Sequence, residues 1–196
     1  MPRGSRRLGV LTASWFLLVL KVSGQGAEPT LKDTMNLIAN TLSSSRAISW
    51  TETVPDLFGA SYTMNSSLTK VNADSSACSL SWASVYTSSD SKVIETYSVN
   101  LATVSDVSVQ PYSEYRKSDY KLKFEVSPET YVVVMKADAP LTGSRESYRK
   151  DKLKSQTKLP KDREARFLLS DQQTANTVSD SIRVAAKICA AERSGH

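Results

Sequence analysis

The chain has 196 residues, enough for one domain with a buried core, and a formal net charge of +5 from 25 Lys and Arg against 20 Asp and Glu. Its single histidine is the last residue, His196, which argues against a Ser-His-Asp hydrolase, a Cys-His peptidase and a His-ligated zinc site. The G-x-S-x-G, P-loop and G-x-G-x-x-G motifs are absent as well, so we predict a protein that is not an enzyme, with no catalytic residue, metal site or cofactor.

Residues 1–24 have the order of a secretory signal peptide. Three arginines precede an apolar run from Leu8 to Leu20, and the small residues Val22 and Gly24 follow it. The run of about 13 residues is shorter than the roughly 20 that a membrane-spanning helix needs. We therefore expect export to the periplasm or the cell exterior and a single mature domain over residues 25–196.

Removal of such a leader would also change the charge of the chain. Four cations would leave with it (Arg3, Arg6, Arg7 and Lys21), so 21 basic residues would remain against 20 acidic ones. The charge of the whole chain therefore indicates no specific nucleic-acid partner.

The first expected element of the domain is a helix over residues 28–42. Thr30 is its predicted N-cap, and apolar residues recur at a spacing of three to four (Leu31, Met35, Ile38 and Leu42). A strand over 48–54 follows, and then two short strands at 61–64 and 68–71.

Alternating residues predict further strands at 78–87, 92–101 and 104–109, with a turn at 88–91. The most regular alternation lies between Tyr120 and Val126, and an apolar run from Tyr131 to Met135 follows Pro128. We interpret residues 120–136 as a hairpin at the centre of an antiparallel sheet. Many short strands at similar spacing favour an α+β domain with an antiparallel sheet or a partial barrel, packed by an N-terminal and a C-terminal helix.

The composition changes at residues 141–166, which hold nine Lys and Arg against four acids. A long polar connection inside a compact domain is usually either functional or disordered. We expect a basic loop here, either simply solvated or docked on an anionic surface. The candidate residues for such an anionic-partner site are Arg145, Arg149, Lys150, Lys152, Lys154 and Lys158.

The end of the chain predicts a short strand at 167–169 and then a helix. Ser170 and Gln173 match the S-x-x-Q capping box, and apolar residues up to Cys189 mark one face of the helix. Cys78 lies on the apolar face of its expected strand. Because an even number of cysteines in an exported protein favours a disulfide, we predict a Cys78–Cys189 bridge, the alternative being two separate buried thiols.

Two further groups of side chains are candidate sites. Three tyrosines (Tyr112, Tyr115 and Tyr120) alternate with Arg116, Lys117 and Lys121, which would either line a binding groove or cover the sheet edge. Glu95 and Glu125 are expected to be ordinary solvated charges rather than an acid and base pair.

The segment FLLSDQQTANTVSDSIRVAAKIC, residues 167–189, together with the strands before it, resembles small bacterial secreted proteins of unknown function with a pleckstrin-homology-like sheet closed by a C-terminal helix. The helix that follows Pro29 is similar to the N-terminal element of the same proteins. The resemblance implies a fold and carries no catalytic residue to this chain.

Two functions are compatible with these expectations. The first is an exported domain that binds a partner protein or an envelope component through its sheet edge or basic loop. The alternative is a carrier of a small apolar ligand, held between the sheet and the helices.

Overall fold

The computed structural model describes residues 29–55, 60–120, 123–159 and 164–194. The expected signal peptide at residues 1–24 and the terminal His196 lie outside these ranges. No helix within them is long and apolar enough to cross a membrane.

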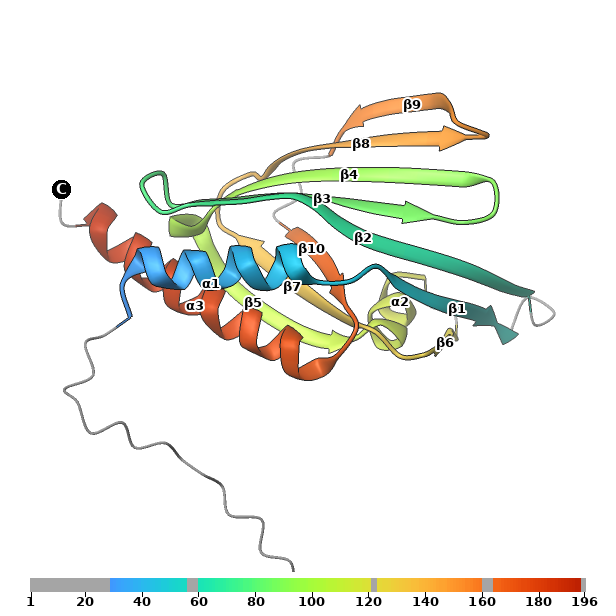
Figure 1. The fold of residues 1–196 in the computed structure, drawn as a ribbon, viewed down its shortest axis with the longest axis horizontal. Coiled ribbons are helices and arrows are strands. Elements are labelled where there is room, and N and C mark those ends of the chain that lie inside the picture. The colour runs from blue at the N-terminus through green and yellow to red at the C-terminus, as the bar shows by residue number, and fades with distance from the viewer. Residues whose placement is uncertain (1–28, 56–59, 121–122, 160–163, 195–196) are drawn as a thin grey trace, which may run out of the picture.

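The domain is α+β, as predicted (Figure 1). Its helices in the described residues are α1 (Leu31–Ser44), α2 (Tyr112–Tyr120) and α3 (Gln172–Ser194), with one 3-10 turn, η2 (Leu101–Thr103). The strands are β1 (Ile48–Val54), β2 (Ala60–Asp74), β3 (Ser79–Thr87), β4 (Ser91–Asn100), β5 (Val104–Pro111), β6 (Glu125–Ser127), β7 (Tyr131–Ala137), β8 (Thr142–Arg149), β9 (Lys152–Lys158) and β10 (Glu164–Leu169).

The strands form two antiparallel sheets. The large sheet has the order β6-β1-β2-β3-β4-β8-β9, and the small sheet has the order β10-β7-β5. The two short strands expected at 61–64 and 68–71 are parts of one strand, β2, whose pairing with β3 shifts between Thr69 and Asn72. Lys70 lies in this bulge at a φ of 53°. The extra residue explains why the apolar alternation of β2 is broken in the sequence.

The small sheet separates two spaces inside the molecule. Along β10, Ala165, Phe167 and Leu169 belong to the main core, which also contains α1 and α3. The alternate residue Leu168 belongs to a second, smaller core around Trp50, and Arg166 on the same face lines a cavity. Because successive side chains of a strand point to opposite faces, β10 and β7 have the helix-packed core on one side and this second region on the other.

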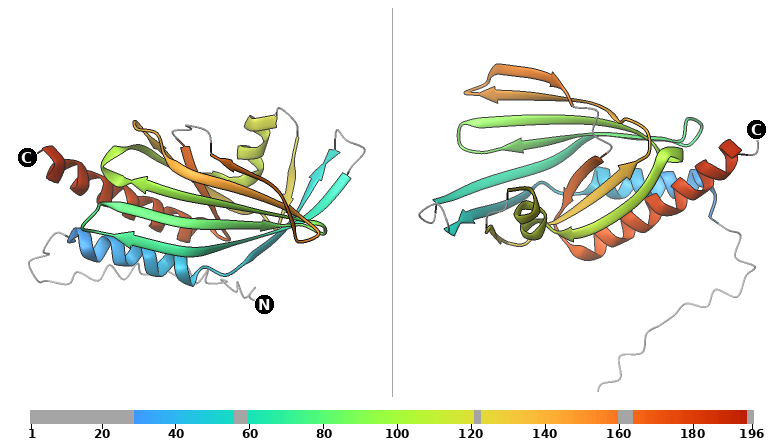
Figure 2. Two further views of the ribbon diagram at one scale, coloured as in Figure 1. Left: turned by 90° about the horizontal axis from the view of Figure 1, so that it is seen from above. Right: turned by 180° about the vertical axis from the view of Figure 1, so that it is seen from behind.

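Helices α1 and α3 lie side by side and close the main core (Figure 2). The predicted Thr30 cap is confirmed, since its Oγ1 accepts a hydrogen bond from the Asp33 amide at 3.1 Å. The apolar face of α1 is buried against α3 and β2 as expected. Between the sheets, the Trp82 ring stacks on Tyr97 and meets the edge of Phe167 with ring centroids 5.4 Å apart.

The cap of α3 differs from the predicted capping box. The side chain that accepts a hydrogen bond from the helix is Asp171, whose Oδ1 lies 2.8 Å from the Thr174 amide nitrogen. This backbone hydrogen bond lowers the pKa of the Asp171 carboxyl. Asp171 lies one residue beyond Ser170 and is itself a preferred N-cap residue, so the S-x-x-Q match was out of register by one position.

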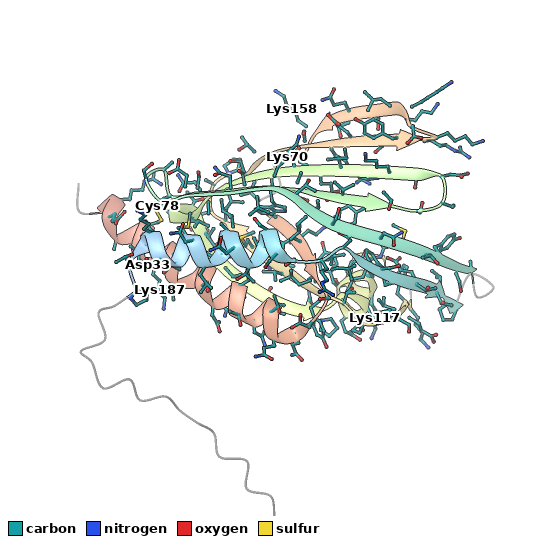
Figure 3. The ribbon with its side chains drawn as sticks, viewed as in Figure 1. Asp33, Lys70, Cys78, Lys117, Lys158 and Lys187 are labelled. Carbon is teal, nitrogen blue, oxygen red and sulfur yellow. A yellow bond between two sulfur atoms is a disulfide. The ribbon has the colours of Figure 1, made fainter. Side chains whose placement is uncertain are left out.

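The Cys78–Cys189 disulfide is present, with Cα atoms 5.9 Å apart. Cys78 does not lie on a strand as expected but in the turn before β3, at a φ of 47°. Asp74 closes this turn by accepting hydrogen bonds from the Ser76 hydroxyl and from the Ala77 and Ser76 amides, which lower the pKa of its carboxyl. Figure 3 shows Cys78 beside the C-terminal part of α3.

The predicted hairpin over 120–136 is wrong. Residues 112–120 form helix α2, and β6 pairs with β1 in the large sheet, with Val126 opposite Glu52. The apolar strand β7 instead lies between β10 and β5 in the small sheet. Its almost wholly apolar sequence is explained by burial on both faces, with Val133 in the main core and Val134 in the second.

The predicted basic loop over 141–166 is also wrong. Strands β8 and β9 form a hairpin, which we call the arm (Thr142–Lys158), joined by Lys150 and Asp151 at φ values of 49° and 58°. Two consecutive residues with positive φ are typical of a tight hairpin turn, which Asn-Gly more often supplies. Every residue of β9 is exposed, so no apolar alternation marked it as a strand.

Candidate functional site: a charged groove between the two sheets

Two adjoining cavities lie between the large sheet and the small sheet. The first has a volume of about 770 Å³ and the second about 310 Å³. Four residues line both: Glu95, Tyr115, Arg145 and Arg166. We call the combined space the groove, and these shared residues lie at its centre.

Strand periodicity explains why polar side chains meet in the groove. Glu95 on β4 lies directly opposite Arg145 on β8, so both point to the same face of the large sheet. Arg166 comes from β10, on the side of the small sheet that faces away from the main core. Helix α2 adds Tyr112, Tyr115 and Arg116, whose spacing of three and four residues places them together.

Glu95 is buried, at 4% exposure, contrary to the expectation of a solvated charge. Tyr97 donates its hydroxyl to Glu95 Oε2 at 3.0 Å, and Arg145 Nε lies 3.8 Å from Oε1. The ion pair with Arg145 is long, and the Arg145 side chain is half exposed. Arg145 is therefore only loosely held by its carboxylate partner.

A second buried carboxylate, Glu52, lies at the other end of the groove at 6% exposure. Trp50 Nε1 donates to its Oε1 at 3.0 Å, and Arg116 Nη2 lies 3.1 Å from its Oε2. The Arg116 guanidinium also lies 4.7 Å from the centroid of the Phe124 ring. These contacts tie α2 to β1 and fix one end wall of the groove.

Arg166 has a different environment. It donates from Nη1 to the Tyr115 hydroxyl and lies 5.3 Å from the centroid of that ring. Tyr115 in turn donates its hydroxyl to Glu164 Oε1 at 3.2 Å. Within the part of the chain that the structure describes, no carboxylate lies within 4.0 Å of the Arg166 guanidinium, unlike those of Arg116 and Arg145.

Three tyrosines of the groove, Tyr86, Tyr97 and Tyr112, have raised pKa values. Burial, reinforced by the nearby Glu95 carboxylate, raises the pKa of Tyr86 to about 12. Burial also raises the pKa of Tyr97 next to Glu95 and that of Tyr112 next to Glu52. Burial alone would lower the pKa of Arg166, but Tyr115, Tyr97 and Glu95 outweigh it and raise the pKa. The groove thus presents neutral phenols and a permanently charged guanidinium.

The predicted basic residues divide between the groove and the arm. Arg145 lines the groove, whereas Arg149, Lys150, Lys152, Lys154 and Lys158 are exposed on the arm. Figure 3 shows Lys158 on the arm, well away from α2 and its Lys117. The structure therefore does not gather the six residues into one site.

The tyrosine cluster was the better indication of the groove. Tyr112, Tyr115 and Arg116 do line it, as one of the two alternatives held. Glu52, Glu95 and Arg166 were missed as groove residues. The sequence pattern that could have revealed them is a charged residue at the alternating positions of an apolar strand face, as with Glu95 between Val93 and Tyr97.

Other parts of the described chain offer less chemistry. A third cavity, of about 270 Å³, lies between β5 and α3, where Arg183 Nε donates to the Val107 carbonyl at 3.1 Å. Among the described residues no cluster of His, Cys, Asp and Glu could hold a metal ion.

No protein-family model matches the chain, and searches of curated proteins and of solved structures returned no match.

Proposed function

We propose that this protein is an exported, non-enzymatic binding protein that holds a small molecule in the groove between its two sheets. The observation that carries this proposal is the burial of charged side chains around a cavity rather than around a filled core. Glu52 and Glu95 are as buried as core residues, yet they lie on the walls of this space.

Burying a carboxylate costs several kcal/mol unless hydrogen bonds and counter-charges offset the cost. In this fold each carboxylate has both, from a tyrosine or tryptophan and from an arginine. Such preorganised polar groups around a cavity of several hundred Å³ are typical of ligand sites. A merely structural network would be expected to close the space that these side chains surround.

The proposal can be tested by a thermal-shift screen of small organic compounds, followed by amide NMR mapping of the compounds that stabilise the protein. We expect shifts to concentrate at Glu95, Tyr115 and Arg166, and Arg145→Gln to weaken binding. Arg46→Gln, the same change at an exposed position outside the groove, is the matched control. Compounds that bind only outside the groove, or none that bind at all, would contradict the proposal.

A second function is favoured by the exposure of the arm. It carries six cations and two acids, and its outer strand β9 is fully exposed. An anionic envelope component would meet these cations without any change in the fold, each contributing on the order of 1 kcal/mol near an anionic surface. Lysine on an edge strand is also a common protection against aggregation, which is why we place this function second.

Co-sedimentation with anionic and neutral vesicles distinguishes the two readings of the arm. Binding to anionic vesicles that falls on raising the salt and is lost in a Lys150, Lys152 and Lys154 to Gln variant would support the docking function. Equal sedimentation with neutral vesicles would leave the lysines with the protective role alone.

A further inference from the structure

Arg166 differs from the other arginines of the groove because, among the described residues, no carboxylate lies within ion-pair distance of its guanidinium. Arg116 and Arg145 have carboxylates at 3.1 Å and 3.8 Å, whereas the partners of the Arg166 guanidinium are the phenols of Tyr115 and Tyr86. Two acids of the groove have direct partners other than Arg166: Glu95 accepts from Tyr97 and pairs with Arg145, and Glu164 accepts from Tyr115. Glu95 acts on Arg166 only through its more distant charge. A partly buried guanidinium that contacts no carboxylate directly can form a charge-assisted hydrogen bond with an incoming anion.

From this arrangement we infer that the ligand of the groove carries a carboxylate or a phosphate that pairs with the Arg166 guanidinium, a step that rests on the proposed function. A guanidinium presents its donors in a fork that matches the two oxygens of such a group. Arg145, half exposed and loosely paired, is placed to supply a second cation to the same anion.

The lining of the second cavity indicates that the remainder of the ligand is apolar. The second cavity meets Arg166 and continues along apolar and aromatic side chains (Met64, Tyr86, Val93, Tyr112 and Leu168). Glu52 and Arg116 also line this cavity, but they are paired with each other, so the polar groups left to a ligand there are mainly the tyrosine hydroxyls. The groove is therefore suited to an amphipathic organic anion, with its head at Arg166 and its body in the second cavity.

The arm provides a route for such an anion. One face of β8 carries Arg145, Ser147 and Arg149, and Lys152 of β9 is paired with Arg149. A positive edge therefore extends from the groove towards the tip of the arm. Such a field raises the local concentration of anions and speeds their association at low salt.

Titration calorimetry with four probes tests the inference: decanoate, decyl phosphate, 1-decanol and inorganic phosphate. We expect decanoate or decyl phosphate to bind at least about tenfold more tightly than 1-decanol, the range expected for a charged hydrogen bond. The preferred head group identifies a carboxylate or a phosphate as the source. Inorganic phosphate, which lacks the apolar body, should bind more weakly than decyl phosphate.

Variants assign this preference to the guanidinium. Arg166→Gln should reduce the tenfold difference to the part that Arg145 supplies, and Arg166→Lys should retain more of it because the charge at this position remains. Arg46→Gln, the same change at an exposed position outside the groove, should leave it intact. Far-UV circular dichroism confirms folding, and Arg166→Lys still tests the assignment if Arg166→Gln does not fold.

Three results would overturn the inference: 1-decanol binding as tightly as decanoate and decyl phosphate, a preference that is undiminished in Arg166→Gln, or no binding of any probe. None of these decides the proposed function by itself. A neutral compound that maps to the groove in the NMR screen would preserve the binding function while removing the anionic ligand.

Discussion

At the scale of single residues, the tyrosines that lie next to buried carboxylates determine the charge and hydrogen bonding of the groove. Tyr86, Tyr97 and Tyr112 have raised pKa values because burial and the neighbouring Glu95 or Glu52 disfavour a second negative charge. Each phenol therefore remains a hydrogen-bond donor up to alkaline pH. Their ionisation would place two negative charges side by side and disrupt the groove.

For Tyr86 this gives a prediction with a definite sign. A pKa of about 12 in the folded state, above its ordinary 10, means that the folded protein holds the phenol proton more tightly than the unfolded chain does. The stability contributed by the protonated group is full below pH 10 and is lost as the pH rises through 12. We expect a loss of about 2 kcal/mol from this residue over that range.

Denaturant unfolding of the wild type and of Tyr86→Phe between pH 9 and pH 12 measures this contribution. The phenylalanine variant cannot ionise at this position, so its unfolding free energy should fall less steeply with pH. Parallel curves for the two proteins would show that the Tyr86 proton is not held more tightly in the folded state.

The buried charges were in part readable from the sequence. Glu52 is in phase with Ile48, Trp50 and Val54, and Glu95 has the same parity as the buried Tyr97 and Val99. Alternation therefore indicated that both carboxylates face inward. It gave no indication of the counter-charges, because Arg116 and Arg145 lie 64 and 50 positions away in the chain.

Among the secondary-structure elements, the arm is the one whose strands and turn are least predictable from the local sequence. Its strand β9 has no buried face, and its turn is Lys-Asp rather than Asn-Gly. The hairpin is instead held by the pairing of β8 with β4 over eight residue pairs. By contrast, α1 and α3 each bury one apolar face, so their helical periodicity predicted them correctly.

Gly143 is the residue that allows β8 to approach β4 so closely. A Cβ atom at this position would lie 2.5 Å from the Thr96 carbonyl oxygen and 2.7 Å from Leu159 Cδ1. The leucine can move, but the carbonyl belongs to the neighbouring strand. We expect Gly143→Ala to destabilise the protein by about 1 to 3 kcal/mol, as is usual for overpacking.

Hydrogen exchange should locate this loss in the amides of β8 and β9, since the strain arises where the arm joins the large sheet. Ser147→Ala, on the same strand, is the control and should change stability by less than about 0.5 kcal/mol. An unchanged unfolding free energy in Gly143→Ala would mean that the two strands can separate slightly at no cost.

At the scale of the whole molecule, the two sheets divide the interior into unequal parts. The main core contains both long helices, whereas the groove is bordered by strands and by the short helix α2. The sequence predicted an antiparallel sheet with two helices but not the second sheet. Adjacent strands were expected to pair, whereas β6 and β7 belong to different sheets. That partition depends on contacts between distant residues, which periodicity alone does not specify.

The disulfide connects two distant parts of the chain, the turn before β3 and helix α3. Cys78 precedes β3 of the large sheet, and Cys189 lies in α3, which covers the small sheet. The two cysteines are 111 positions apart in the sequence. In the chain-entropy model, a cross-link over a loop of this length stabilises by about 4 to 5 kcal/mol by restricting the unfolded chain. We expect the double variant Cys78→Ser, Cys189→Ser to lose stability of that order and yet to fold.

Folding should persist because α3 is also held by its own apolar face, where Ala175, Val178, Ile182 and Ala185 are fully buried. Denaturant unfolding of the wild type with and without reductant, next to the double variant, measures the loss. Near-UV circular dichroism of the variant checks that Trp82 and Tyr97 stay packed. If the variant and the reduced wild type both unfolded in buffer, the packing of α3 would be too weak to hold the main core closed. The groove on the other side of the small sheet would then depend on the disulfide as well.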